Sequence, residues 1–141
     1  MSTLYSTRVT AVGGRSGTIR SEDDFLDLPL ALPVTMGGKG GATNPEQLFA
    51  AGYAACFENA VIHVTRNKAT RVKHTDIVAV ADVGLQTDGS GGFVLSVALD
   101  VAITGLDQAT AEEIVQAANA TRPYSNAVRG NIDVAITVAT S

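Results

Sequence analysis

An apolar segment, Leu48 to Phe57 (LFAAGYAACF), lies directly behind a helix-start signal and limits the folds that this chain can adopt. The signal consists of an N-cap residue, a first-turn proline and an amide at the third position: Asn44, Pro45 and Gln47. It predicts a helix from Pro45 to about Asn67. Because the first half is apolar or small all round, we expect the helix to be buried on nearly every side. A chain this short has few elements able to cover this helix, so we expect a second copy of the same helix, in a homodimer, to pack against it.

Segments with strand-like alternation lie on both sides of this helix. We expect strands at residues 3–12, 18–21, 25–30, 71–87, 93–104 and 132–138, a glycine-rich turn at 13–17, a loop at 33–43 and a hairpin turn at 88–92. A second helix is expected from Asp107, a candidate cap, to about Thr121, and Pro123 ends it. The stretch from Pro123 to Asn131 is expected to be a turn-rich corner. The order βββ-α-ββ-α-β predicts a mixed α+β fold in a single domain over residues 1–141.

Composition narrows the classes of function. Hydrophobic residues make up 45% of the 141 residues and charged residues 17%, which favours a packed core. Ten Lys and Arg against fourteen Asp and Glu give a net charge of −4, which argues against nucleic-acid partners and anionic membranes. One cysteine excludes an intrachain disulfide, and with two histidines it is too few for a structural zinc site. The stretch GGKGGAT lacks P-loop spacing, and the apolar segment is about half a membrane span long. We therefore expect no metal, no other cofactor and no membrane insertion, and, with no signal peptide visible, a cytoplasmic location.

Cys56 is the first candidate for chemistry. A lone cysteine is more often a small buried hydrophobic residue than a nucleophile. Cys56 lies about three turns into the expected helix, where the helix dipole stabilises a thiolate little, so a reactive Cys56 needs a cation from elsewhere in the fold. Arg15, in the glycine-rich turn, is the candidate cation, and a solvated turn arginine is the alternative.

Glu46 stands in the first turn of the expected helix, where a carboxylate suits the positive end of the helix dipole. It precedes Cys56 by ten residues, about 15 Å along a helix axis, so the two side chains cannot touch within one helix. If both serve one site, either Arg15 bridges them or a partner subunit supplies one of them.

Three segments resemble one known family: GGRSG at 13–17, TNPEQLFAAGYAACF at 43–57 and PYSNAVRGNID at 123–133. They closely resemble the organic hydroperoxide resistance (Ohr) branch of the Ohr/OsmC family, in order and over nearly the whole chain. The resemblance implies an intertwined α+β homodimer with long central helices packed against β-sheets and active sites at the subunit interface. It also implies reduction of organic hydroperoxides, fatty-acid hydroperoxides included, by a cysteine thiolate.

The same resemblance implies the site residues. Cys56 matches the peroxidatic cysteine, Arg15 the catalytic arginine, and Glu46 the glutamate that orients the arginine. Attack on the peroxide O–O bond would give an alcohol and a sulfenic acid on Cys56. Three aromatic side chains within two turns of Cys56 fit a pocket for an alkyl hydroperoxide, although such residues are more often plain core: Phe49, Tyr53 and Phe57.

Arg122 is a departure from the family pattern, because the family has a resolving cysteine immediately before the PYSN segment. In the family, dihydrolipoyl groups reduce the disulfide that this cysteine forms. Three interpretations stay open. The protein is a one-cysteine peroxidase that an external thiol, a dihydrolipoyl group or a monothiol, reduces directly. Or Arg122 is a second cation near Cys56 that stabilises its thiolate or binds an acidic peroxide. Or the protein is a catalytically impaired peroxide sensor, scavenger or lipid-like ligand-binding protein.

Overall fold

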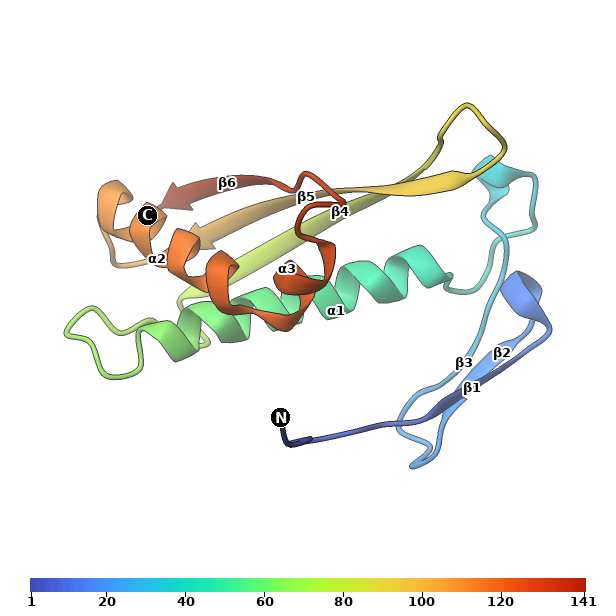
Figure 1. Cartoon of the computed structure of the whole chain (residues 1–141), viewed down its shortest axis with the longest axis horizontal. Coiled ribbons are helices and arrows are strands. Elements are labelled where there is room, and N and C mark those ends of the chain that lie inside the picture. The colour runs from blue at the N-terminus through green and yellow to red at the C-terminus, as the bar shows by residue number, and fades with distance from the viewer. The chain divides into compact units, whose positions relative to one another are not determined.

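A computed structural model describes all residues, 1–141, which form two compact units, Met1–Leu48 and Phe49–Ser141 (Figure 1). Three α-helices and two three-stranded sheets make up the chain, which confirms the mixed α+β class. The single domain over 1–141 and the homodimer stay predictions.

The sheet of the first unit is antiparallel, in the order β1-β2-β3: Val9–Val12, Thr18–Ser21 and Asp27–Pro29. Val9 pairs with Ser21, and Ile19 pairs with Leu28. The strand expected at residues 3–12 is therefore only its last four residues, and the one expected at 25–30 is also shorter.

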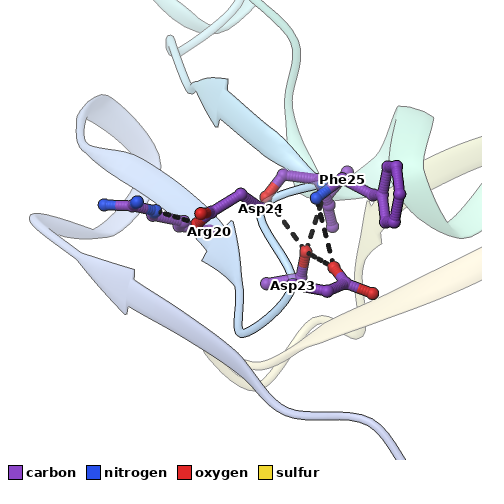
Figure 2. A network of polar contacts seen from close by, with 6 residues as sticks. Arg20, Asp23, Asp24 and Phe25 are labelled. Carbon is purple, nitrogen blue, oxygen red and sulfur yellow. Dashed lines mark hydrogen bonds and ion pairs between the residues drawn. The ribbon is translucent and has the colours of Figure 1, made fainter.

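A polar turn joins β2 to β3 (Figure 2). Asp23 Oδ1 accepts hydrogen bonds from the Ser21 hydroxyl at 2.6 Å and from the Phe25 N–H at 3.1 Å. Asp24 has a φ of 65° and accepts a hydrogen bond at 2.5 Å from Arg20 Nε. The hydrogen bond from Ser21 lowers the pKa of Asp23, and the one from Arg20 lowers the pKa of Asp24. The turn is thus held by side chains where the backbone ladder stops.

Helix α1, Pro45–Val64, begins where the sequence predicts. The Gln47 N–H donates to Asn44 Oδ1 at 2.9 Å, which confirms the N-cap. The capping box is not reciprocal, because Gln47 Oε1 accepts a hydrogen bond from the Thr43 hydroxyl instead. The helix ends three residues before the predicted Asn67: the buried Thr65 hydroxyl donates to the Val61 carbonyl and accepts from the Val72 N–H.

One face of α1 is buried within the protomer. The expectation of burial on nearly every side includes a homodimer partner, so it stays a prediction. The buried side chains are Tyr53, Phe57, Ala60 and Val61. Ala51 and Ala55, on the opposite face, are exposed. An apolar helix therefore keeps a face of small side chains uncovered within one protomer.

The second unit is built on a sheet in the order β4-β5-β6: Ile77–Thr87, Phe93–Ile103 and Ala135–Thr140. Strands β4 and β5 form the expected antiparallel hairpin, and β6 lies parallel to β5 (Figure 1). A parallel pair needs a long crossover connection, which α2 (Gln108–Thr121) and α3 (Pro123–Val128) provide. Alternate residues of β5 are buried with α1 and α2 in the core: Val97, Leu99, Val101 and Ile103. The helices thus cover one face of the sheet.

At the α2–α3 junction, the expectation of a turn-rich corner from Pro123 to Asn131 without a helix was wrong. Asp107 caps α2 as expected, since its Oδ1 accepts from the Thr110 N–H at 2.8 Å. Pro123 follows the end of α2, as expected, but it also occupies the first turn of α3, so the turn-rich corner contains a short helix. Arg122 between the helices is extended, with φ −101° and ψ 147°, because a residue before proline disfavours the helical region.

Candidate active site

The glycine-rich turn that carries Arg15 is a short 3₁₀ helix, η1 (Gly14–Ser16), between β1 and β2. A Cβ on Gly17 would lie 1.7 Å from the Val12 carbonyl oxygen, so only glycine allows the chain to close here. The Gly17 N–H donates to the Gly14 carbonyl at 3.2 Å and completes the turn. The sequence thus fixes the base of the Arg15 side chain on a tight, hydrogen-bonded loop.

Arg15 and Glu46 form a bidentate ion pair within the first unit. Arg15 Nη1 donates to Glu46 Oε2 at 2.8 Å, and Arg15 Nη2 donates to Glu46 Oε1 at 2.5 Å. The Glu46 side chain is 15% exposed and the Arg15 side chain 39%. The two hydrogen bonds match the planar fork of the guanidinium to the carboxylate, which fixes the orientation of the arginine.

The Arg15–Glu46 ion pair favours the charged form of both side chains. The hydrogen bond from Arg15 holds the pKa of Glu46 below its usual value, against the opposing effect of burial. The hydrogen bond to Glu46 raises the pKa of Arg15. Glu46 also lies in the first turn of α1, where the helix dipole favours a carboxylate. Both groups are therefore ionised at neutral pH.

Cys56 lies on α1 in the second unit and is partly buried, with no disulfide partner. It follows Gly52 by one turn on the same side of the helix, and side chains on a helix lean toward its N-terminus. A Cβ on Gly52 would lie 2.7 Å from Tyr124 Oη, so the absence of a side chain at Gly52 lets Tyr124 of α3 reach the α1 backbone. An aromatic side chain therefore packs closely on the α1 backbone at Gly52.

Three aromatic rings gather beside this part of α1. The Tyr53 and Tyr124 rings pack edge to face with centroids 5.9 Å apart, and Phe49 lies 5.9 Å from Tyr53 and 6.3 Å from Tyr124. Tyr53 is 1% exposed and belongs to the core, as does Phe57. No sequence pattern marks Tyr124 as functional, and its only local signal is Pro123, a residue typical of the first turn of a helix.

Arg122, at the position where the resemblance implies a resolving cysteine, has a buried Nε with no hydrogen-bond partner. The residue is partly buried at the junction of α2 and α3. A buried guanidinium N–H without an acceptor is costly.

The structure thus joins Arg15 to Glu46 and places Cys56 in the other unit, so the shared role of all three stays a prediction. No group of three or more His, Cys, Asp or Glu side chains is arranged to hold a metal ion. None of the helices combines the length and hydropathy needed to cross a bilayer.

Comparison with known proteins places the chain in a family. A family model described as OsmC-like protein matches residues 38–137. The organic hydroperoxide resistance protein of Xanthomonas axonopodis pv. citri is 44% identical over 96% of this chain and 95% of its own length. The crystal structure of an organic hydroperoxide resistance protein from Legionella pneumophila matches with a TM-score of 0.93 at 48% identity, over 98% of this chain and 99% of that one. That of OhrB from Bacillus subtilis gives a TM-score of 0.86 at 43% identity, over 96% and 99%.

These matches confirm the resemblance that the three sequence segments indicate. The chain belongs to the OsmC-like family and, within it, to the organic hydroperoxide resistance branch. A role in organic hydroperoxide resistance follows from that membership at the level of the family.

Proposed function

We propose that this protein is a thiol peroxidase that reduces organic hydroperoxides, alkyl and fatty-acid hydroperoxides among them, to alcohols. The Cys56 thiolate attacks the terminal oxygen of ROOH, the O–O bond breaks, and the alkoxide takes a proton and leaves as ROH. Sulfur loses two electrons and becomes a sulfenic acid. The names of the relatives support the substrate class. The bidentate Arg15–Glu46 pair is the observation that carries the proposal.

In this proposal Arg15 stabilises negative charge on the Cys56 sulfur and then on the leaving alkoxide. The middle of a helix supplies little positive charge of its own, so a fixed guanidinium is the group that the reaction needs. Glu46 acts through Arg15, because its two oxygens hold the guanidinium fork in one plane. Glu46 is therefore a positioning residue.

A homodimer is part of the proposal. Glu46 and Cys56 are separated by ten residues of α1, about 15 Å along its axis, so one helix does not bring them together. The exposed Ala51 and Ala55 give α1 a face of small side chains on which a second copy of the helix could pack closely. We propose that the partner subunit supplies the Arg15–Glu46 pair that faces each Cys56.

Reduction of the sulfenic acid has to come from outside the chain, because Cys56 is the single cysteine and Arg122 occupies the resolving position. A first external thiol would displace water from the sulfenic acid and form a mixed disulfide, and a second thiol would release Cys56. A dihydrolipoyl group carries both thiols in one molecule, whereas a monothiol is needed twice. The predicted cytoplasmic location belongs to this proposal, since that compartment supplies reduced thiols.

The test is steady-state consumption of cumene hydroperoxide by the purified protein, with dihydrolipoamide and a monothiol as separate reductants. We expect turnover by the unchanged chain, and none by Cys56→Ser, which keeps the size of the side chain but lacks the thiolate. Turnover by Cys56→Ser at the rate of the unchanged chain would refute the assignment.

The second candidate function, a peroxide sensor, scavenger or lipid-like ligand-binding protein, is favoured by one observation, the presence of Arg122 where the family has a cysteine. Arg122→Cys separates the two functions. A peroxidase that works with one cysteine turns over before the substitution, whereas a sensor or scavenger is oxidised once and gains turnover only with the new cysteine.

A further inference from the structure

The segment 65–75, which joins α1 to β4 in the second unit (Figure 1), holds a cluster of positive charge. Four of the chain's ten Lys and Arg residues lie in it, and all four are exposed: Arg66, Lys68, Arg71 and Lys73. No Asp or Glu occurs from residue 59 to residue 75, whereas the rest of the chain has six Lys and Arg against fourteen Asp and Glu. This segment, named the basic loop, is therefore a positive patch on a protein of net charge −4.

The backbone of the basic loop is held by the core, so its charges stand in a defined arrangement. Val72 is 1% exposed and belongs to the core, and its N–H donates to the buried Thr65 Oγ1 at 3.0 Å. Arg71 and Lys73, on either side of Val72, are exposed. At the end of the loop the Lys73 N–H donates to Asp76 Oδ2 at 3.1 Å. A buried valine thus anchors the loop while the cations on both sides of it meet solvent.

No carboxylate of the chain is paired with a cation of the basic loop, because the chain's ion pairs involve only Arg15 and Arg20. The C-terminal end of α1 favours positive charge, but that effect fades within one turn. Lys68 and the two cations that follow it lie four or more residues beyond the helix end at Val64. Like charges this close repel one another, and an acidic partner surface would offset that repulsion. Local structure therefore does not account for the cluster.

The basic loop follows the same helix that carries Cys56. His63, exposed in the last turn of α1, comes seven residues after Cys56 and so lies on about the same side of the helix, about 10 Å along its axis. The helix ends at Val64, eight residues after Cys56, which is about 12 Å of helix rise. The surface of a protein docked on the loop is thus separated from the sulfur, whereas a reactive group on a long flexible arm spans such a distance.

We propose that the basic loop docks an acidic protein that carries a reducing dithiol on a flexible arm. The inference rests on the proposed peroxidase function and adds the surface at which the reductant arrives. The dithiol gives up two electrons and two protons and becomes a disulfide, and the Cys56 sulfenic acid takes them up and returns to a thiol with release of water. A protein fits better than a nucleic acid, because the loop has no Phe, Tyr or Trp for base stacking and the rest of the chain repels a polyanion.

The experiment compares two reductants in steady-state reduction of cumene hydroperoxide: free dihydrolipoamide, and an acidic lipoyl domain that carries the dihydrolipoyl group on a lysine. Dihydrolipoamide dehydrogenase and NADH keep both reduced. Arg71→Gln/Lys73→Gln removes two charges and keeps the Val72 anchor. We expect kcat/KM for the domain to fall about tenfold in this variant, and kcat/KM for the uncharged dihydrolipoamide to stay unchanged. High salt should remove the difference between the variant and the unchanged protein, because it screens the attraction.

Arg8→Gln/Lys39→Gln is the matched control, because both residues are exposed, lie outside the basic loop and form no ion pair. It makes the same change in net charge and should leave kcat/KM for the domain unchanged. Three results would overturn the docking surface and leave the peroxidase function intact: an unchanged kcat/KM for the domain in the loop variant, an equal fall for free dihydrolipoamide, or an equal fall in the control. Loss of oligonucleotide binding together with the first result would assign the loop to nucleic acid. Absence of turnover by the unchanged protein with both reductants would instead refute the proposed function.

Discussion

Replacing Gly52 with alanine sets two effects of opposite sign against each other at one position of α1. Alanine in a helix interior is favoured over glycine by about 1 kcal/mol. The added Cβ, however, would lie 2.7 Å from Tyr124 Oη and 3.1 Å from Tyr124 Cε2 and Cζ. Optimal contacts between such atoms are about 3.5 Å or longer, so the Tyr124 ring has to move.

The cost of that movement follows from what holds the ring. Tyr124 packs edge to face on Tyr53, which is itself 1% exposed and cannot yield, and it contacts Phe49. Overpacking costs about 1–3 kcal/mol, and each aromatic pair contributes about 0.5–1.5 kcal/mol. Tyr124 is 39% exposed, so part of the strain is released toward solvent. We expect a cost of about 2 kcal/mol from the ring, and a net loss of about 1 kcal/mol after the helix gain.

A double-mutant cycle measured by urea unfolding, at one fixed protein concentration, tests this reasoning. Gly52→Ala should destabilise the unchanged chain by about 1 kcal/mol but stabilise the Tyr124→Ala background by about 1 kcal/mol, because the clash is gone there. The sign reversal is the expected signature. An identical effect of Gly52→Ala in both backgrounds would refute the view that Tyr124 is why glycine occupies this position.

Three further predictions concern the start of α1 and the arginine beside it. Asn44→Ala removes the N-cap acceptor of Gln47 and should lower the free energy of unfolding by about 1 kcal/mol; no change in the urea midpoint would contradict the cap. Glu46→Gln should cost about 1 kcal/mol at pH 7, a modest value because Arg15 is 39% exposed. Since Arg15 lowers the pKa of Glu46, the difference should stay constant from pH 6 to 9 and vanish only when acid protonates Glu46 below that lowered pKa; a difference that persists in strong acid would show a cause other than charge. Arg15→Lys keeps the charge but loses the bidentate fork, so kcat for cumene hydroperoxide should fall at least tenfold, and an unchanged kcat would argue against the fork.

Short sequence patterns correctly predicted two helix N-caps and the hairpin of β4 and β5. Asn44 and Asp107 were expected as N-caps, and each accepts the hydrogen bond that the position requires. The hairpin of β4 and β5 was also expected from its glycine-rich turn. These features depend on side chains a few residues apart, so a single sequence is sufficient to predict them.

The sequence alone does not predict features that depend on how distant parts of the chain pack, or which of two roles a residue takes. Pro123 was interpreted only as the end of α2, whereas it also starts α3, because proline is compatible with both roles. The sequence also does not indicate that α1 leaves Ala51 and Ala55 exposed within one protomer, because helix packing decides which face is covered and composition does not.

In the candidate site, too, the sequence indicated some features, and only the fold shows others. Arg15 and Glu46 are 31 residues apart, and family resemblance, with the glycine-rich turn as a local hint, indicated their pairing. Tyr53 and Ser125 have ordinary sequence surroundings, and only the fold shows that their buried hydroxyl groups have no hydrogen-bond partner.

The most direct test of the central claim is the fate of Cys56 after one equivalent of cumene hydroperoxide, followed by intact-protein mass spectrometry with dimedone as the sulfenic-acid trap. We expect one cumyl alcohol released and one dimedone adduct formed per chain, on Cys56, with neither in Cys56→Ser. A protein that leaves the peroxide unreduced, or reduces it while Cys56 stays an unmodified thiol, would refute the peroxidase role of Cys56.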